Sequence, residues 1–491
     1  MKVLLISPLS NSFEWKSVPP LGLAYLASVL RRHNHTVRIL DMHIPLFARL
    51  KTLESYISIF SPELIGVSAN TFGFKKTLEV IRRAKKTRPD IPIVVGGTHA
   101  SVMRDKILSD VPELSFAVYG EGEFTLLELC SAINSTSDFS NILGLIWRKD
   151  KEIVTNPPRP LNNDLDGLPF ASESFDLFGF DKYYSPSRSL ILTSRGCPSE
   201  CIYCAVHEIY GRKFRPRSPE NVVDEIEYLH IRYGTNHFHI IDDNFSFDLA
   251  RAKRICDEIL KRKLDITWDT PNGIRADLVD PELLYKMKKS GCQHVRFGIE
   301  SANQAILNGL NKHLEVNDVK KAIEWSKECG LKVSAFFLVG SPGENFESVK
   351  QSVEFALTMD IGAIFSVLTP YPRTKFWKWV FTNARWTQDP YEYLYSHGHT
   401  DQPSVPFETN DFTKNERARA LKFVERTIIR KERQQEYESA LKSRFPRLHG
   451  SGILKGVSIL LSTLMGSKFL NLILQNKVPL ELQRIVASKI R

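Results

Sequence analysis

The sequence predicts an α/β protein with two successive sheet domains and a helical C-terminal region. Short apolar runs alternate with helical patterns over residues 1 to about 135, and the alternation resumes at Leu190. Five strands joined by crossover helices are typical of a doubly wound parallel sheet, because the crossovers must cover both faces. A chain of 491 residues, 42% hydrophobic and 25% charged, is long enough for two or three globular domains.

The elements of the first domain follow one another in βα order. We expect strands at residues 3–7, 37–40, 64–68, 93–95 and 116–119, and helices at 21–32, 74–87, 100–108 and 123–133, with a further helix within 46–60. In such a sheet a ligand lies beyond the carboxyl ends of the strands, at the point where the strand order reverses.

Small and polar residues stand where these strands end. Paired glycines let the backbone approach a bulky ligand closely, and small hydroxyl groups leave room while offering hydrogen bonds. The residues that we expect at a ligand site on this basis are Pro19, Gly22, Ser68, Asn70, Gly96, Gly97, His99 and Glu121. The alternative is a Rossmann-like domain with ordinary turn residues at these positions.

Residues 138–187 are expected to connect the two sheet domains. The runs 142–147 and 153–155 suggest a hairpin, and the proline-rich run 156–160 can continue neither strand nor helix. The next strands are expected near 190–195, 236–241, 266–270, 294–299, 332–338 and 363–368, with helices between them.

Three of the seven cysteines lie together directly after the first of these strands. Cys197, Cys201 and Cys204 have C-x-x-x-C-x-x-C spacing. Thiolate sulfur selects iron–sulfur clusters, zinc or copper(I), and three cysteines leave one iron of a 4Fe–4S cube open. The alternative is a Cys₃His zinc site with His207, but structural zinc sites usually split their ligands into two separated pairs. The spacing therefore favours the cluster.

The cysteine loop C-P-x-x-C-x-Y-C resembles that of radical S-adenosylmethionine (SAM) enzymes. The order P-P-L-G-L, G-V-S, V-V-G-G-x-H-A-S and Y-G-E-G-E before it resembles the subgroup with an N-terminal cobalamin-binding domain. The resemblance covers residues 1 to about 380. It implies a Rossmann-like cobalamin domain at 1–137, a hairpin and linker at 138–187 and a partial (β/α)₆ radical SAM barrel at 188–380. Charge and helical spacing predict a basic helical region at 381–491.

The resemblance also implies the cofactors. The three cysteines would hold a 4Fe–4S cluster, which SAM chelates at the open iron. The SAM molecule offers an ammonium, a carboxylate and ribose hydroxyls, which suit acidic groups and an arginine. The residues expected around it, on the cysteine loop and at the ends of the barrel strands, are Tyr203, Asp242, Asn244, Arg275, Glu300 and Gly340.

One near-match to a cobalt-binding motif is not expected to bind cobalt. Asp41-Met42-His43 with Leu46 almost matches D-x-H-x-x-G, but leucine replaces the glycine, and the motif follows the second strand where cobalamin proteins have it after the first. We therefore expect His43 to be a surface or pocket-edge residue. In the subgroup, cobalamin is typically bound without a histidine below it.

The activity implied by the resemblance is methylation of an unactivated carbon. One electron, from a donor such as flavodoxin or ferredoxin, would cleave SAM to a 5′-deoxyadenosyl radical that removes hydrogen from the substrate, and methylcobalamin would supply the methyl group. The substrate is expected to be a small molecule or lipid, of apolar, isoprenoid-like character. The alternatives are a radical cyclase or rearrangement enzyme of the same architecture, and a zinc-stabilised protein that binds nucleic acid or membrane.

The net charge of +10 lies entirely in the C-terminal tail. Residues 411–491 hold 17 Lys and Arg against 7 Asp and Glu, and an apolar stripe at helical spacing runs from 453 to 473. This pattern predicts either packing on the core or a helix in a membrane interface. No stretch of 18 apolar residues is present. The cysteines are odd in number, seven, and their spacing is not typical of disulfides, which indicates a reducing compartment. We expect a cytoplasmic protein with peripheral membrane contact, and no nucleic-acid partner.

Overall fold

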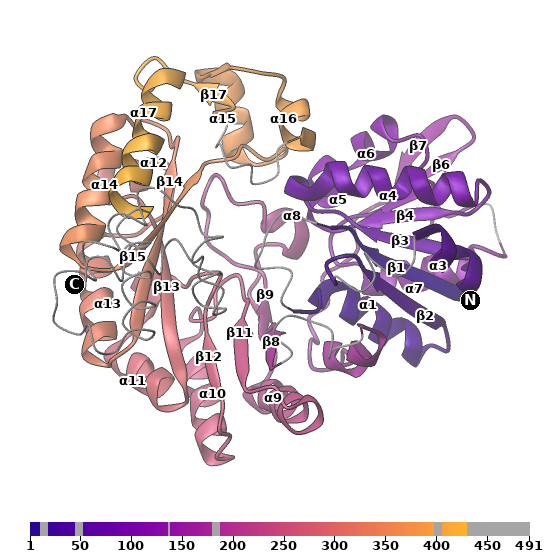
Figure 1. The fold of residues 1–491 in the computed structure, drawn as a ribbon, viewed down its shortest axis with the longest axis horizontal. Coiled ribbons are helices and arrows are strands. Elements are labelled where there is room, and N and C mark those ends of the chain that lie inside the picture. Colours follow the sequence, from indigo (N-terminus) through magenta and orange to yellow (C-terminus); the bar gives the residue numbers. More distant parts are fainter. Residues whose placement is uncertain (10–17, 45–52, 136–137, 179–186, 397–404, 430–491) are drawn as a thin grey trace, which may run out of the picture.

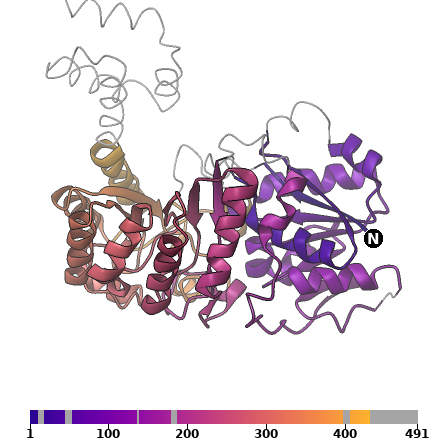
Figure 2. The same cartoon turned by 90° about the horizontal axis from the view of Figure 1, so that it is seen from below.

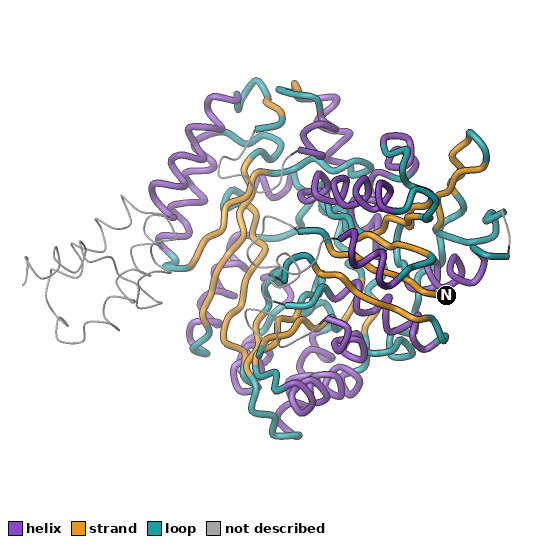
Figure 3. Tube along the Cα trace, turned by 45° about the vertical axis from the view of Figure 1, so that its right-hand side comes forward, coloured by secondary structure: helices purple, strands orange, loops and turns teal. Residues whose placement is uncertain are grey.

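The computed structural model describes residues 1–9, 18–44, 53–135, 138–178, 187–396 and 405–429. Within these ranges the chain forms a seven-stranded sheet near the N-terminus and a six-stranded sheet in the middle of the chain. The two sheet domains lie side by side (Figures 1 and 2). Helices flank both sheets (Figure 3), as an α/β architecture requires.

The N-terminal sheet has the strand order β2-β1-β3-β4-β5-β6-β7. Strands β1 to β5 are parallel, and β6 and β7 continue the sheet antiparallel. The strands are β1 Lys2–Ser7, β2 Thr36–Asp41, β3 Leu64–Ser68, β4 Ile93–Gly96, β5 Phe116–Val118, β6 Leu145–Lys149 and β7 Glu152–Thr155. The doubly wound parallel sheet expected from the sequence is therefore present.

The hairpin β6–β7 belongs to this sheet, whereas the sequence placed it in the connector. The cause is tertiary, since Trp147 is fully buried and its indole Nε1 donates to Asn156 Oδ1 at 3.1 Å. Asn156 also donates to the carbonyls of Phe139 and Ile142. Side-chain burial thus extends the first domain beyond residue 137.

The helices of this domain lie near their predicted positions, with one exception. The expected helix 100–108 is divided at Arg104, whose φ is +55°. The Arg104 guanidinium lies 3.7 Å from the centre of the Tyr119 ring and pairs with Glu208 of the second domain. The helices are α1 Leu21–Arg32, α3 Leu53–Phe60, α4 Phe74–Thr87, α5 Thr98–Met103, α6 Asp105–Asp110 and α7 Glu123–Ala132.

The second sheet is a partial barrel with the parallel order β15-β14-β13-β12-β11-β8. Its edge strands β8 and β15 do not pair with each other in the described residues. The six expected βα units are confirmed. The strands are β8 Arg188–Ile191, β11 His237–Ile240, β12 Thr267–Asp269, β13 Cys292–Glu300, β14 Lys332–Val339 and β15 Gly362–Val367.

Local sequence determines where the barrel helices begin. In α9 the Ser218 hydroxyl accepts from the Asn221 amide at 3.2 Å, Pro219 occupies the first turn, and Gly234 ends the helix at φ +67°. The helices are α8 His207–Tyr210, α9 Pro219–Tyr233, α10 Leu249–Lys261, α11 Pro281–Lys289, α12 Gln304–Gly309, α13 Val316–Glu328 and α14 Phe346–Thr358.

The C-terminal region returns to the first domain. Helix α16 packs against α4, and the Tyr395 hydroxyl donates to Asp110 while its ring lies 5.1 Å from that of Phe74. The aromatic stretch 386–395 therefore ties the two domains together. The elements here are α15 Lys375–Asn383, β16 Arg385–Trp386, α16 Pro390–Ser396, β17 Phe407–Glu408, α17 Lys414–Val424 and a π-helical turn Glu425–Ile429.

The predicted apolar stripe at 453–473 lies outside the described residues. The charged helical run that begins at Lys414 is described as far as residue 429. Among the described helices, none is long and apolar enough to cross a membrane.

Candidate active site

The cysteine loop leaves the barrel through a sharp turn at Gly196. The short strand β9 Ser194–Arg195 pairs with β10 Arg215–Pro216, and Gly196 follows at φ +81°. A Cβ atom at Gly196 would lie 2.4 Å from the Lys213 carbonyl oxygen, so a side chain does not fit there. The Gly196 amide donates to Asp243 Oδ2 at 3.0 Å, which holds the start of the loop.

Asp242 supports the same turn from the end of β11. Its carboxylate accepts from the Thr193 amide at 2.6 Å, from the Thr193 hydroxyl, and from the Ser194 hydroxyl at 2.5 Å. Both carboxylate oxygens are thus engaged within the protein. The role that the structure indicates for Asp242 is to position the cysteine loop, and its predicted contact with SAM remains a prediction.

The three cysteines are half-buried free thiols on this loop. An iron–sulfur cube binds each thiolate to a different iron, so three free cysteines on one loop suit a cluster that keeps one iron open.

The surroundings of the loop agree with this assignment. Burial raises the pKa of the Cys204 thiol to about 12, and neighbouring Cys201 and Cys197 add to the effect. A thiolate at Cys204 therefore requires a bound cationic centre. His207, the fourth ligand of the zinc alternative, donates from Nε2 to the Cys197 carbonyl at 3.1 Å.

A buried group of three polar side chains lies beside the cysteine loop. Glu300, at the end of β13 with φ +72°, accepts from the Tyr203 hydroxyl at 2.9 Å and from Lys312 Nζ at 2.8 Å. Burial lowers the pKa of Lys312, but Glu300 and the nearby Cys201 outweigh it, so the pKa is raised and the ammonium persists. Sequence analysis predicted Tyr203 and Glu300 but missed Lys312, which follows a short helix rather than a strand.

The other predicted SAM-contacting residues have different environments. Arg275 makes a two-point ion pair with Asp277 at 2.8 and 2.9 Å, and its Nη1 lies 3.4 Å from Ser199 Oγ of the cysteine loop. Asn244 is fully buried, and neither its Oδ1 nor its Nδ2 has a hydrogen-bond partner among the described residues. Gly340, at φ +114°, donates its amide to Glu344. Asn244 is therefore the residue of this set with free hydrogen-bonding capacity.

A cavity of about 660 Å³ opens at the carboxyl ends of the N-terminal strands. Its wall combines glycines and small side chains with larger apolar side chains such as Leu5, Leu21 and Phe72, which suits a large, partly apolar ligand. The barrel closes the cavity, so the two domains share it. Predicted residues in the wall are Gly22, Ser68, Asn70, Gly96, Gly97 and Glu121, and the barrel contributes Leu190, Arg195, Ile209, Tyr210 and Ile241.

Pro19 and His99 do not line this cavity. His99 is fully buried, its ring packs 3.9 Å from the Phe74 ring, and burial lowers its pKa to about 3. It is therefore a neutral core residue rather than part of the wall. His43 is buried in the wall, where Nδ1 lies 2.8 Å from Asp41 Oδ1, so it is a pocket residue and not a surface residue.

A buried ion network joins the cavity wall to the cysteine loop. Arg195 pairs with Glu123 at 2.7 Å and with Glu121 at 3.2 Å, and Arg215 pairs with Glu121 at 2.8 Å. All four side chains are at least nine-tenths buried. Sequence analysis predicted Glu121 as a cofactor contact and missed both arginines, although Arg195 stands directly before the glycine of the turn. The Glu121 carboxylate thus pairs with two arginines of the barrel, and its contact with a cofactor stays a prediction.

The comparison with protein families agrees with the two sites. A B12-binding-domain model matches residues 16–130, and a radical SAM superfamily model matches residues 191–356. An uncharacterized methyltransferase of Pyrococcus horikoshii is 33% identical over 390 residues, which cover 78% of this chain and 84% of that protein. The chain belongs to the cobalamin-binding radical SAM family, and it is an enzyme.

Two further relatives mark the range of this family. An anaerobic magnesium-protoporphyrin IX monomethyl ester cyclase of Rubrivivax gelatinosus is 29% identical over 387 residues, covering 76% of this chain and 68% of that one. The radical SAM methyltransferase TsrM of Kitasatospora setae, solved with cobalamin and a [4Fe-4S] cluster, matches with a TM-score of 0.67 at 22% identity, covering 80% of this chain and 81% of that chain. The second match shows a shared fold.

The cofactors of the chain are accordingly a 4Fe–4S cluster, SAM and cobalamin. Cys197, Cys201 and Cys204 are the residues that fit the cluster, and the cavity between the domains fits cobalamin. A zinc-stabilised binding protein, the alternative from another class, is excluded by the family.

Proposed function

We propose that this enzyme transfers a methyl group to an unactivated carbon of an apolar substrate. The observation that carries the proposal is the shared cavity, whose wall joins the strand ends of the cobalamin domain to Arg195 and Tyr210 on either side of the cysteine loop. A methyl donor and a radical-generating centre must both reach one substrate carbon, and a common cavity supports this. The methyltransferase of Pyrococcus horikoshii supports the reaction class.

The protein residues have distinct tasks in this proposal. The cluster supplies one-electron chemistry to SAM, and cobalamin supplies methyl-group chemistry. Asp242 and Asp243 hold the turn from which the cysteines project. Glu300 and Lys312 would fix SAM through charge-assisted hydrogen bonds, and Asn244 would donate and accept with its unpaired amide.

Apolar side chains in the wall of the shared cavity, among them Leu9, Leu21 and Phe72, support an apolar substrate. Ile202 and Tyr203 of the loop pack against a group of buried side chains from the barrel and the C-terminal elements, namely Ile306, Leu310, Leu368, Phe376, Val380 and Phe407. Low-polarity walls also exclude water from a radical reaction.

The proposal is tested by anaerobic incubation with methyl-labelled SAM, a one-electron donor of the flavodoxin or ferredoxin type, and a lipid extract of the host. We expect label in an apolar product together with 5′-deoxyadenosine. The Rubrivivax relative makes cyclisation the second candidate, and it predicts 5′-deoxyadenosine and a substrate that loses hydrogen without gaining label. Label recovered only in polar products would contradict the apolar substrate.

We also propose that the tail brings the enzyme to an anionic membrane surface. The support is the charge of residues 411–491, because each basic side chain near an anionic leaflet contributes about 1 kcal/mol. Liposome co-sedimentation of the whole chain and of a chain ending at His449 tests this, at low and high salt. We expect salt-sensitive binding of the whole chain to anionic vesicles. Equal partitioning of the two folded chains would contradict it.

A further inference from the structure

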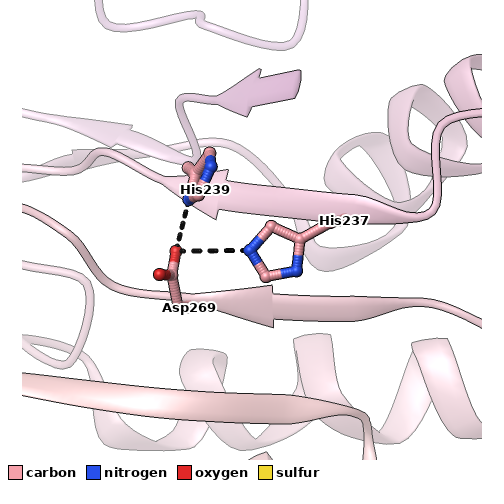
Figure 4. A group of neighbouring side chains, drawn as sticks. All are labelled: His237, His239 and Asp269. Atoms are coloured by element: carbon pink, nitrogen blue, oxygen red, sulfur yellow. Dashed lines mark hydrogen bonds and ion pairs between the residues drawn. The ribbon is translucent and has the colours of Figure 1, made fainter. Parts of the chain in front are cut away.

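We propose that His237, His239 and Asp269 form a binding site for a divalent transition-metal ion such as zinc, separate from the cysteine loop. The two histidines are two residues apart on β11, so their side chains project from the same face of the strand. Asp269 is on the neighbouring strand β12, opposite His239 in the parallel register. Figure 4 shows the Asp269 carboxylate facing both imidazole rings.

The donor atoms converge on one point. One ligand atom from each residue lies within 4.8 Å of the other two, and in the described part of the chain no other group of three His, Cys, Asp or Glu residues does so. His239 Nδ1 lies 2.6 Å and His237 Nε2 lies 4.0 Å from Asp269 Oδ1. A metal with bonds of about 2.0–2.2 Å to nitrogen and oxygen requires only small side-chain rotations from this arrangement.

Two outer contacts orient the ligands in the manner usual for metal sites. His237 Nδ1 lies 2.7 Å from Thr267 Oγ1, which leaves Nε2 to face Asp269. Arg296 Nη1 donates to Asp269 Oδ2 at 3.1 Å, which leaves Oδ1 to face the histidines. Hydrogen bonds of this kind fix the ring orientation of ligating histidines and the carboxylate oxygen that is presented.

The donor set selects the ion. Two imidazole nitrogens and one carboxylate oxygen suit zinc and its neighbours rather than magnesium or calcium, which prefer oxygen ligands. Three protein ligands leave a fourth position for water. The side chains of His237 and His239 are 20% and 19% exposed, so an ion can reach them. The positive charge of Arg296 repels the metal ion, so we expect weaker binding than in a closed four-ligand site.

The position suggests what such an ion does. Strands β11 and β12 lead to Asn244 and Arg275, which stand at the carboxyl ends where the active site lies. An ion between the two strands would hold these ends in register. This role does not depend on which substrate the enzyme methylates. The competing explanation is a hydrogen-bond network of His239, Asp269 and Arg296 that binds no ion.

The experiment measures metal content. The enzyme with its cluster and cobalamin is incubated anaerobically with zinc, freed of unbound metal by gel filtration, and analysed by mass spectrometry for zinc and iron. We expect one zinc ion per chain in addition to the cluster iron. His237→Ala and Asp269→Asn should lose the zinc and keep the iron, while Cys197→Ala should lose the iron and keep the zinc.

His294→Ala is the matched control. His294 is also a half-buried barrel histidine and stands opposite Asp269 in the β12–β13 register, but its Nε2 lies 2.8 Å from Ser334 Oγ and it is outside the group. This variant should retain zinc. Zinc should also raise the unfolding temperature of the wild type and of His294→Ala but not that of Asp269→Asn, which keeps the shape of the side chain. Absence of zinc from the wild type, or zinc that is lost with the cysteines instead, would overturn the proposal.

Discussion

The two cofactor-facing regions of this molecule differ in the kinds of residue that form them. The N-terminal cavity is walled by glycines and small side chains, such as Gly97 and Ser68, together with apolar side chains such as Leu21. The barrel site is made of charged and hydrogen-bonded side chains, such as Glu300 with Lys312 and Asp242 with the loop. The first region accommodates a ligand by shape, and the second holds a reactive loop by electrostatics. Substitutions in the two regions should therefore have different effects on cofactor binding and stability.

The largest effect is expected at the cysteine loop. Cys197→Ala, Cys201→Ala or Cys204→Ala should each lose the cluster iron and reduce 5′-deoxyadenosine formation to background, because two thiolates hold a cube poorly. Iron analysis and chromatography of the anaerobic reaction measure this. Cys256→Ala, at a buried thiol in α10, is the control and should keep both. A triple-alanine loop that still produced 5′-deoxyadenosine would show that the assignment is wrong.

The next effect is expected at the ion network that links the two regions. Arg195→Ala leaves the buried Glu123 carboxylate without its partner and Glu121 with Arg215 alone, and should cost about 3–5 kcal/mol of unfolding free energy, measured by urea titration. Arg212→Ala is the control, since its pair with Glu200 at 3.4 Å is largely exposed and contributes about 0–1 kcal/mol. Equal stabilities of the two variants would show that the network does not stabilise the fold.

This network should also give an acid-dependent stability. Burial raises the pKa of Glu123, but the Arg195 guanidinium outweighs it, so the pKa lies below its usual value. The stabilisation is therefore complete above the unfolded pKa of about 4.3 and is lost as the pH falls through the lower folded value. Urea titrations between neutral and acid pH should show a steeper loss for the wild type than for Arg195→Ala. Parallel losses would contradict this.

A smaller effect is expected in the cavity wall. Gly97 has φ +106°, and a Cβ atom there would lie 2.7 Å from the Ala69 carbonyl oxygen, so Gly97→Ala should cost about 1–3 kcal/mol and weaken cobalamin retention. Gly22→Ala is the control for stability alone, because a Cβ atom at Gly22 meets no protein atom and helix α1 should gain about 0.5–1 kcal/mol, while Gly22 itself lines the cavity. Thermal unfolding and the cobalamin absorbance after gel filtration measure both quantities. Equal stability of the two variants would contradict the strain argument.

The smallest effect is expected at His43. His43→Ala should leave the absorption and EPR spectra of bound cob(II)alamin unchanged, because His43 lines the cavity from the edge strand β2, whereas a cobalt-binding histidine is expected after the first strand. The companion variant is Asp41→Asn, which changes the hydrogen-bond partner of His43. Loss of nitrogen hyperfine splitting in the His43→Ala spectrum would show that His43 is a cobalt ligand.

Several features were predictable because they depend on neighbouring residues in the chain. Strand β3 and helix α4 were predicted with the observed bounds, since apolar periodicity marks both. The cysteine spacing alone favoured a cluster over zinc. Helix 100–108 was predicted as continuous, because its division depends on the contact of Arg104 with Tyr119 and Glu208, both distant in sequence.

The sequence by itself determined the order of the elements, the cysteine motif and the set of small residues that face the cavity, because local backbone preferences and short-range spacing encode these. Tertiary structure alone decided which polar residues have their hydrogen bonds satisfied within the protein. Glu121 and Asp242 were predicted as cofactor contacts, which stays a prediction, but the sequence did not indicate that Arg195, Arg215 and Thr193 would contact their carboxylates. The partner of a buried charge is a residue that folding brings close, so it cannot be identified from a single sequence.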